Sequence, residues 1–402
     1  MTAVTLNKSE LMAPAVMQTM QQRSLVIGAI GAVATIAGWF LAGSDAAKTG
    51  FFSAYLIGYM FWLGLALGCM AILMLYHLVG GKWGTVIRRI LEAGMTTLPM
   101  MAILFIPIGL NLPKLYAWAR PEELAKDPKL ADLASSYLNP TGIWTRAVIY
   151  FAIWIVMAFL LSKWSSEQDT PAGGEKSTLR FRALSGPGLV IYSFSISFAV
   201  IDWVMSLQAR WISTIYGFIF IVGEVLSAYC FVVIIERILT KRKPMAEYVT
   251  PKELNDHGNF MLTFVMLWTY FSFSQLLIIW AGNLPDEISW FVRRFNGGWG
   301  PVELFLALFH FAVPFALLLS KSLKRNARKL AFLASWLMFV RIVDIFWHVE
   351  PANFPTFHLS WVLFAVLAGM GGLWIWYFLR NLRSRPLLAL YAPQTLKHLG
   401  DE

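Results

Sequence analysis

Gly58-Tyr-Met-Phe-Trp-Leu-Gly-Leu-Ala-Leu-Gly-Cys-Met-Ala-Ile-Leu-Met-Leu-Tyr76 is a stretch of 19 residues without a charged side chain. As an α-helix it would rise about 28 Å, which matches the ~30 Å hydrocarbon core of a bilayer. It lies inside a longer apolar run, 52–79. We therefore expect this part of the chain to form a transmembrane helix.

The same pattern recurs along the chain. Nine further apolar runs lie at 25–43, 94–112, 143–162, 187–207, 211–236, 258–281, 301–320, 330–349 and 359–380. The composition agrees with membrane embedding, because 14% of the 402 residues are charged, whereas a soluble domain carries about 25%. Strands of an outer-membrane barrel would instead be alternating segments of ~10 residues. The sequence predicts an all-α integral membrane protein with about ten transmembrane helices.

Polar segments at the two ends of the chain frame one membrane domain. The N-terminal segment, 1–24, carries Lys8, Glu10 and Arg23 ahead of the first run. Because a signal peptide would place its apolar core earlier, we expect the first run to be retained as a helix. The prediction is a single ten-helix domain over 25–380, followed by a C-terminal tail over 381–402.

Lysine and arginine residues are unevenly distributed between the two sets of loops. The N-terminal segment, the loops after the second, fourth, sixth and eighth runs, and the C-terminal tail carry 23 of the 33 when Arg380, at the end of the last run, is counted with the tail. The other loops carry 8. Because basic loops stay in the cytoplasm, we expect a multi-pass protein of the bacterial inner (cytoplasmic) membrane with both ends cytoplasmic. The net charge of +10 has the same origin, so no nucleic-acid partner is expected.

Few residues in the chain have the chemistry of a cofactor or catalytic site. Cys69 and Cys230 each lie in an apolar run, where we expect them to be small core residues. Two cysteines cannot form a four-cysteine metal or iron–sulfur site, and no Cys-x-x-Cys-His sequence for covalent haem occurs. No P-loop or Ser/His/Asp set is recognisable. We expect no catalytic residue, metal site or bound cofactor in this chain.

Two of the less basic loops are long enough to be ordered. Residues 113–142 read as a short surface helix with a mixed-charge face, which is either a solvated connector or a docking platform for an external partner. Residues 282–300 combine turn-forming glycines with Trp290 and Trp299, a composition typical of an ordered loop at the membrane interface.

Ionisable residues inside the membrane are costly, and they are usually paired or functional. The ninth run carries Arg341, Asp344 and His348, whose spacings of three and four place them on one helical face. Asp344 can neutralise Arg341, and His348 lies one turn nearer the outer surface. The cluster is interpreted either as an ion pair that locks the helix to a neighbour, or as a proton-conducting or ligand-binding stripe.

Six further ionisable residues are distributed through the predicted bilayer. Glu224 lies near the middle of the sixth run with no cation at an adjacent turn, so a partner must come from another helix. By inferred depth, His77 and Glu92 are inner, Glu224, His310 and Arg341 are central, and Asp202, Glu303, Asp344 and His348 are outer. Taken singly, each of these residues is more often structural than catalytic. Taken together, they form the graded series that a proton path requires.

Histidine and aromatic residues leave two other chemistries open. A haem b would need two inward histidines at matched depth, and His310 has no obvious partner. The 18 Trp and 30 Phe side chains could line a quinone pocket, although such residues more often contact lipid, the interface or the core.

Several dispersed motifs resemble one family. They are Phe51-Phe-Ser-Ala-Tyr-Leu, Leu75-Tyr-His-Leu-Val-Gly-Gly-Lys-Trp-Gly, Ile87-Arg-Arg-Ile-Leu-Glu-Ala, Ser197-Phe-Ala-Val-Ile-Asp-Trp-Val-Met-Ser-Leu, Phe273-Ser-Gln-Leu-Leu-Ile-Ile-Trp-Ala-Gly-Asn-Leu-Pro-Asp-Glu, Gly297-Gly-Trp-Gly, Phe309-His-Phe-Ala-Val-Pro-Phe and Arg341-Ile-Val-Asp-Ile-Phe-Trp. Together, over roughly residues 50–350, they resemble the smaller ten-helix membrane subunit (the F-type subunit) of bacterial alternative complex III. That subunit is related to the NrfD/polysulfide-reductase membrane subunits.

The resemblance implies a role in a respiratory quinol:cytochrome c oxidoreductase. It implies two four-helix bundles, from helices 2–5 and 6–9, flanked by helices 1 and 10. The partners would be a larger NrfD-like sister subunit, an iron–sulfur subunit and c-type cytochrome subunits, which would carry the iron–sulfur clusters and c-haems. The ion-pathway residues carried over would be Asp202, His310, Arg341 and Asp344. The family is also named as quinone-binding, which the residues neither support nor exclude.

Three functions remain as hypotheses. The leading one is a non-redox subunit of this oxidoreductase that supports quinol oxidation and carries a proton-translocation path. The second is a purely structural membrane anchor for the sister quinol-oxidising subunit. The third is an independent proton-coupled secondary transporter, which would predict internal repeats with broken helices, and no such repeat is found in the sequence.

Overall fold

The computed structural model describes residues 11–170, 177–389, 391–393 and 395. The structure is all-α and 84% helical, with no strand among the described residues. In that part of the chain, ten helices are long and apolar enough to cross a membrane. These findings confirm the predicted fold class. The segments 1–24 and 381–402, expected to be cytoplasmic, fall partly outside the described residues.

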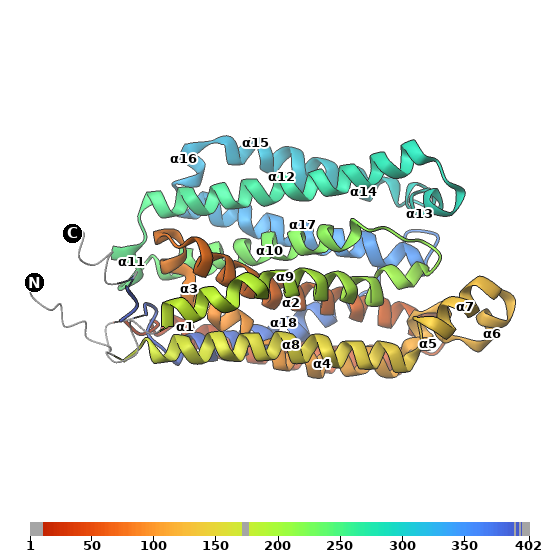
Figure 1. Cartoon of the computed structure of the whole chain (residues 1–402), viewed down its shortest axis with the longest axis horizontal. Helices are drawn as coiled ribbons and strands as arrows, with labels where there is room; N and C mark the ends of the chain where they lie inside the picture. Colours follow the sequence, from red (N-terminus) through yellow and green to blue (C-terminus); the bar gives the residue numbers. More distant parts are fainter. Residues whose placement is uncertain (1–10, 171–176, 390, 394, 396–402) are drawn as a thin grey trace, which may run out of the picture.

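Each predicted run overlaps one of the spanning helices, which lie side by side along the long axis of the molecule (Figure 1). The spans are α1 (Val16–Leu41), α2 (Asp45–Val79), α3 (Lys82–Met95) with α4 (Leu98–Leu110), α8 (Pro140–Glu167), α9 (Ser177–Trp203), α10 (Tyr216–Leu239), α12 (Pro251–Gly282), α14 (Gly300–Leu306) with η4 (Ala307–Ala312) and α15 (Val313–Leu319), α17 (Ala327–Asn353) and α18 (Val362–Arg383).

Several helices start earlier than the apolar runs because their first turns are polar. In α12 the Thr250 side chain accepts a hydrogen bond from the backbone N–H of Lys252, and Glu253 accepts one from the backbone N–H of Thr250 at 2.9 Å. This capping box satisfies backbone donors at the helix start, and α12 therefore begins at Pro251, seven residues before the apolar run.

Short helices mark the two ends of the molecule (Figure 1). The loop end carries α5 (Leu112–Leu115), η1 (Ala117–Ala119), α6 (Pro121–Lys126), α7 (Pro128–Ser136), η3 (Met205–Gln208) and α13 (Pro285–Phe295). The opposite end carries α11 (Met245–Tyr248) and α16 (Lys321–Lys324). We call it the basic end, because the loops with most of the Lys and Arg residues lie there.

The spanning helices form the two predicted four-helix bundles. In the first bundle, α2, α4, α8 and α9 pack in a ring, and in the second, α10, α12, α14–α15 and α17 do the same. The bundles meet where α2 packs against α10. A Cβ atom on Gly68 would lie 2.4 Å from the carbonyl oxygen of Glu224. Glycine therefore lets the two central helices approach closely.

The first and last spans, α1 and α18, pack against each other beside the bundles. Their contact is built from glycines: a Cβ atom on Gly31 would lie 2.3 Å from the backbone nitrogen of Gly369, and one on Gly372 would lie 2.2 Å from that of Gly28. Neither helix could come so close with larger residues at these positions.

Residues 80–93 lie between two predicted spans, yet α3 is a buried helix in which the arginine side chains of 88 and 89 are about 4% exposed. Near its start, the backbone carbonyl of Trp83 bonds to His257 in the first turns of α12. Near its end, Glu92 accepts a hydrogen bond from Ser165 in the last turn of α8. Both contacts are at the basic end. Helix α3 therefore ties the two bundles together there, and α3 and α4 together form the third span.

Candidate functional site

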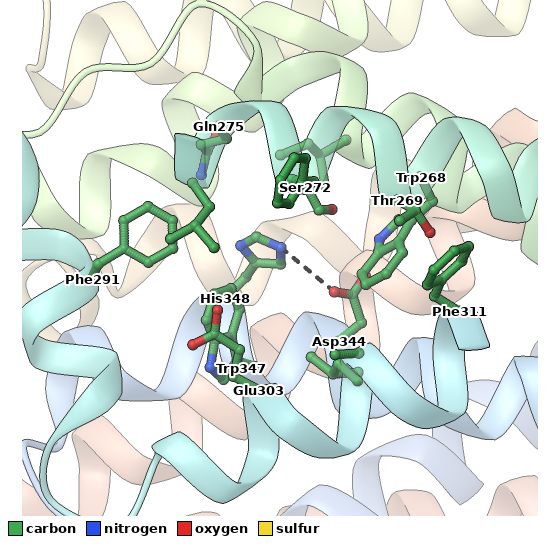
Figure 2. A pocket seen from close by; sticks show the side chains of 15 residues that line it. Trp268, Thr269, Ser272, Gln275, Phe291, Glu303, Phe311, Asp344, Trp347 and His348 are labelled. Carbon is green, nitrogen blue, oxygen red and sulfur yellow. Dashed lines mark hydrogen bonds and ion pairs between the residues drawn. The ribbon is translucent and has the colours of Figure 1, made fainter. Parts of the chain in front are cut away.

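A cavity of about 250 Å³ lies within the second bundle, toward the loop end (Figure 2). Helices α10, α12, α13, α14, η4 and α17 line it. Three of the predicted residues, Glu303, Asp344 and His348, contribute to its lining. The other polar side chains around it are those of Trp268, Thr269, Ser272 and Gln275 from α12 and Trp347 from α17. The cavity brings two carboxyl groups and an imidazole together.

Asp344 is the residue that joins the cavity to the middle of the bundle. Its Oδ2 atom pairs with the Arg341 guanidinium and accepts a hydrogen bond from Trp268 Nε1 at 3.3 Å. Its Oδ1 atom lies 3.6 Å from His348 Nε2 (Figure 2) and has no hydrogen-bond partner among the described residues. The spacing-based prediction that Arg341, Asp344 and His348 share one face of the helix is confirmed.

The His348 ring is held from the side opposite Asp344. Its Nδ1 atom lies 3.0 Å from the Tyr216 hydroxyl of α10, within hydrogen-bond distance. The ring is 4% exposed. Tyr216 of the neighbouring helix thus fixes the Nδ1 atom, and the Nε2 atom faces the free Oδ1 atom of Asp344.

Arg294 on α13 fixes the loop end of α17, a role that its position in the sequence does not indicate. Pro351 has no N–H to bond the carbonyl of Trp347 four residues earlier, and Arg294 Nε donates to that oxygen at 3.1 Å. Its NH2 group donates to the carbonyl of His348 at 2.7 Å, and its guanidinium lies 3.5 Å from the Trp290 ring centroid. Burial lowers the pKa of Arg294 to about 9.

His310 lies in a π-helical turn, η4, four residues before Pro314. The proline cannot supply the N–H that the carbonyl of His310 would accept, and wide turns often occur where the regular ladder is broken. The His310 ring lies 3.9 Å from the Trp268 ring, between centroids. Neither of its nitrogens has a hydrogen-bond partner in the part of the chain that the structure describes. Trp268 therefore contacts both His310 and Asp344.

Glu224 lies at the junction of the two bundles. Tyr192 of α9 donates a hydrogen bond to Glu224 Oε2 at 3.0 Å, whereas Oε1 is buried without a partner among the described residues. The partner comes from another helix, as predicted. The preceding residue, Gly223, packs against the guanidinium of Arg341: a Cβ atom there would lie 2.3 Å from Arg341 Cζ. Glu224 and the Arg341–Asp344 pair thus lie at adjacent residues of α10.

Asp202 lies apart from this group, at the loop end of the first bundle. Both of its oxygens accept hydrogen bonds from Arg146 of α8, at 2.8 and 2.9 Å, and Tyr150 donates to Oδ2 at 2.9 Å. Asp202 is fully buried. Its partner was not predicted, since Arg146 precedes it by 56 residues and lies in another span.

His77 and Glu92 lie at the basic end, as their inferred depth predicted. Glu92 bonds Arg88 and Arg89 at 2.7 Å each and Ser165 at 2.5 Å. His77 stacks on Phe181 with 4.1 Å between centroids. Neither lines the cavity of the second bundle.

A second buried pair at the basic end was also missed. His257 Nδ1 lies 2.9 Å from Glu236 Oε2, and both side chains are fully buried. Glu236 is the last residue of the run 211–236, at the end of α10, and His257 directly precedes the run 258–281, at the start of α12. A carboxylate and an imidazole near facing helix ends are the only signal that the sequence offers for this pair.

No protein-family model matches this sequence, and no curated protein is similar to it. The chain is a ten-helix, all-α, multi-pass membrane protein.

Titratable side chains follow one another through the second bundle. Glu224, Arg341, Asp344 and His348 lie in this order from the bundle junction to the cavity, with Glu303 on its wall. Most of the cavity lining is apolar, so water in it would be held at the carboxyl and imidazole groups. Carboxyl and imidazole groups linked by such waters can exchange protons.

Proposed function

We propose that this chain is a non-redox membrane subunit of a respiratory quinol:cytochrome c oxidoreductase, and that its second bundle carries a proton-translocation path. The motifs that resemble the smaller ten-helix subunit of alternative complex III support the first part. The cavity lined by Glu303, Asp344 and His348 supports the second. Quinol oxidation would take place with the larger sister subunit, and electrons would pass through the iron–sulfur and c-type cytochrome partners.

In this proposal, Asp344 is the group that exchanges the proton. Its Oδ2 atom is held by Arg341 and Trp268, while Oδ1 faces His348 and the cavity. A proton on Oδ1 can pass to the imidazole or to cavity water without breaking the Arg341 contact. Glu224, with one oxygen unpartnered among the described residues, would supply it from the bundle junction. Glu303 would receive it at the loop end.

The first test is to isolate the chain from native membranes in mild detergent, followed by mass spectrometry and a visible spectrum. The proposal expects a c-type haem spectrum, an iron–sulfur subunit, a second multi-helix subunit and quinol:cytochrome c activity. A chain that is isolated alone, colourless and inactive with quinol would overturn the assignment to this complex.

The second test substitutes Asp344→Asn in the intact complex. An amide keeps the shape of the side chain but cannot carry the proton, so the number of protons moved per electron should fall at least twofold while quinol oxidation falls less. Asp286→Asn, an exposed aspartate at the start of α13, is the matched control. A wild-type proton-to-electron ratio in Asp344→Asn would remove this residue from the coupling path.

A structural anchor is the second candidate, and the Asp202–Arg146 pair favours it. That pair joins α8 to α9 through two hydrogen bonds and leaves no carboxylate oxygen free to exchange a proton. If the chain is only an anchor, substitutions at Asp344 should reduce the yield of assembled complex without changing its coupling ratio. Substrate uptake by proteoliposomes containing the chain alone would instead favour an independent transporter.

A further inference from the structure

A polar cavity, of about 240 Å³, opens at the basic end of the molecule. It lies where the end of α3, the end of α8 and the end of α18 meet. Its polar lining consists of Arg89, Glu92, Thr96, Ser162, Tyr377, Asn381, Ser384 and Arg385. The proposed proton path does not use this cavity, so a ligand bound here would be independent of that path.

The carboxylates near this cavity are already engaged. Glu92 is bonded by Arg88, Arg89 and Ser165, and Asp169 pairs with Arg89. Three arginines thus face two carboxylates, because Arg385 also lines the cavity and donates to the carbonyl of Ser162 at 3.0 Å. The Nε atom of Arg89, whose side chain is 4% exposed, has no hydrogen-bond partner among the described residues. The charge balance and this free donor favour an anion.

An apolar cavity of about 410 Å³ lies farther along α18, toward the loop end. It is formed by α1, α2, α4 and α18 and lined by Ile36, Leu104 and Leu373, among other apolar side chains. Leu373 is one turn from Tyr377, which lines the polar cavity. Ile36 is 57% exposed, so the apolar cavity is open to the lipid side. A polar, basic end and an apolar cleft therefore follow each other along α18.

The geometry points to a binding site for one anionic phospholipid. The phosphate would lie between Arg89 and Arg385 with Asn381 and Ser384 as further donors, and an acyl chain would run along α18 into the apolar cleft. Basic pockets between helices on the cytoplasmic side bind anionic head groups in this way, and the positive-inside rule places the basic end on that side. A free phosphate has no acyl chain to fill the cleft, so the lipid is the occupant that accounts for both cavities.

The test is native mass spectrometry of the full chain in a non-ionic detergent, titrated with dioleoyl phosphatidylglycerol. Dioleoyl phosphatidylcholine is the control for head-group charge, dihexanoyl phosphatidylglycerol the control for chain length, and sodium phosphate the control for a free anion. The long-chain anionic lipid should bind at least tenfold more tightly than either control lipid. Equal binding of phosphatidylcholine would overturn head-group recognition. Equal binding of phosphate or the short-chain lipid would overturn the role of the cleft, because the site would then bind an anion alone.

Two pairs of variants separate the head-group pocket from the cleft. Arg385→Gln should weaken phosphatidylglycerol binding about fivefold, since each basic residue near anionic lipid contributes by about that factor. Arg380→Gln, an exposed arginine on the same helix outside the cavity, should leave binding unchanged.

Leu104→Trp should block the cleft and weaken long-chain binding, while Ile103→Trp, on the lipid-facing surface, should not. If each variant behaved like its control, the lipid would bind elsewhere and the proposal would fail.

Discussion

The two bundles hold their buried aspartates in opposite ways. In the first, Arg146 bonds both oxygens of Asp202, Tyr150 adds a third hydrogen bond, and the packing around them is aromatic. In the second, Asp344 uses one oxygen for Arg341 and Trp268 and turns the other toward His348 and a cavity. Both carboxylate oxygens of the aspartate are therefore bonded in the first bundle, whereas in the second one oxygen has no hydrogen-bond partner among the described residues.

The depth of a charge in the bilayer therefore does not by itself decide its role. When a guanidinium bonds both oxygens of a buried carboxylate, removing that guanidinium strongly destabilises the fold. A carboxylate with a free oxygen beside a cavity can take up a proton there and still accept a hydrogen bond from its arginine through the other oxygen. Matched substitutions in the two bundles should consequently differ in their cost.

The greatest loss of stability is expected from Arg146→Leu in the first bundle. The substitution leaves the fully buried Asp202 without its guanidinium and should lower the free energy of unfolding by about 3–5 kcal/mol. Asp344→Asn in the second bundle also leaves a buried charge, that of Arg341, without its counter-ion, but it should cost less because the amide oxygen can still accept a hydrogen bond from Arg341. Denaturation in mixed micelles, followed by tryptophan fluorescence, measures both. Equal losses would mean that the two aspartates are held alike.

The seam between the bundles should be the next most sensitive place. Gly68→Ala puts a Cβ atom 2.4 Å from the backbone oxygen of Glu224 and 2.8 Å from the Cβ of Ala228. Helices α2 and α10 would have to separate, at a cost of about 1–3 kcal/mol. Gly186→Ala on α9, where a Cβ meets nothing within 4 Å, is the control and should be neutral or slightly stabilising. A neutral Gly68→Ala would mean that the seam is not closely packed in the membrane.

Hydroxyl groups allow a finer comparison. Tyr192→Phe removes the hydrogen bond that Glu224 receives and should cost about 1–2 kcal/mol. Tyr150→Phe removes one bond from Asp202, which keeps two from Arg146, and should cost less than about 1 kcal/mol. The same denaturation experiment ranks them, and the reverse order would contradict the assignment of the better satisfied carboxylate to the first bundle.

The weakest effect is expected at an ion pair on the surface of the loop end, between Asp127 and Arg210. Arg210 donates to Asp127 at 2.7 Å, which lowers the Asp127 pKa below its usual value. The stabilisation is present above the usual aspartate pKa of about 3.9 and is lost as the pH falls through the lower folded pKa.

At pH 6, Asp127→Asn should therefore speed amide exchange in α7 slightly, and Asp132→Asn on the same helix should not. The difference from wild type should disappear at acidic pH. A large effect at pH 6 would mean that pairing matters as much at the surface as in the core.

The spans and one face of one helix could be predicted from the sequence. Long apolar runs identify spans by transfer energy alone, and the spacing of Arg341, Asp344 and His348 fixes their shared face through helix geometry. Both rest on local properties of the chain. Glu224 could be predicted to need a partner from elsewhere, although not that the partner would be Tyr192.

The remaining features depend on contacts between distant parts of the chain. Nothing near Asp202 indicates Arg146, and nothing near Pro351 indicates that Arg294 bonds the carbonyl it leaves free. Helix α3 was read as a loop because Arg88, Arg89 and Glu92 lower its hydropathy, yet when buried those charges pair with one another and with Asp169. Hydropathy averages over a window, so it cannot detect a helix whose polar groups are satisfied by each other.

The glycine contact between α1 and α18 has a consequence for biogenesis. The ribosome releases α1, which ends at Leu41, long before α18, which begins at Val362, so the glycine face of α1 contacts lipid or the insertion machinery while eight other spans are made. Closing this contact requires the first and the last span to meet, and contacts of high sequence separation form slowly. A shortened chain that lacks α18 would leave Gly28 and Gly31 uncovered, and quality control could recognise it by that unpaired first helix.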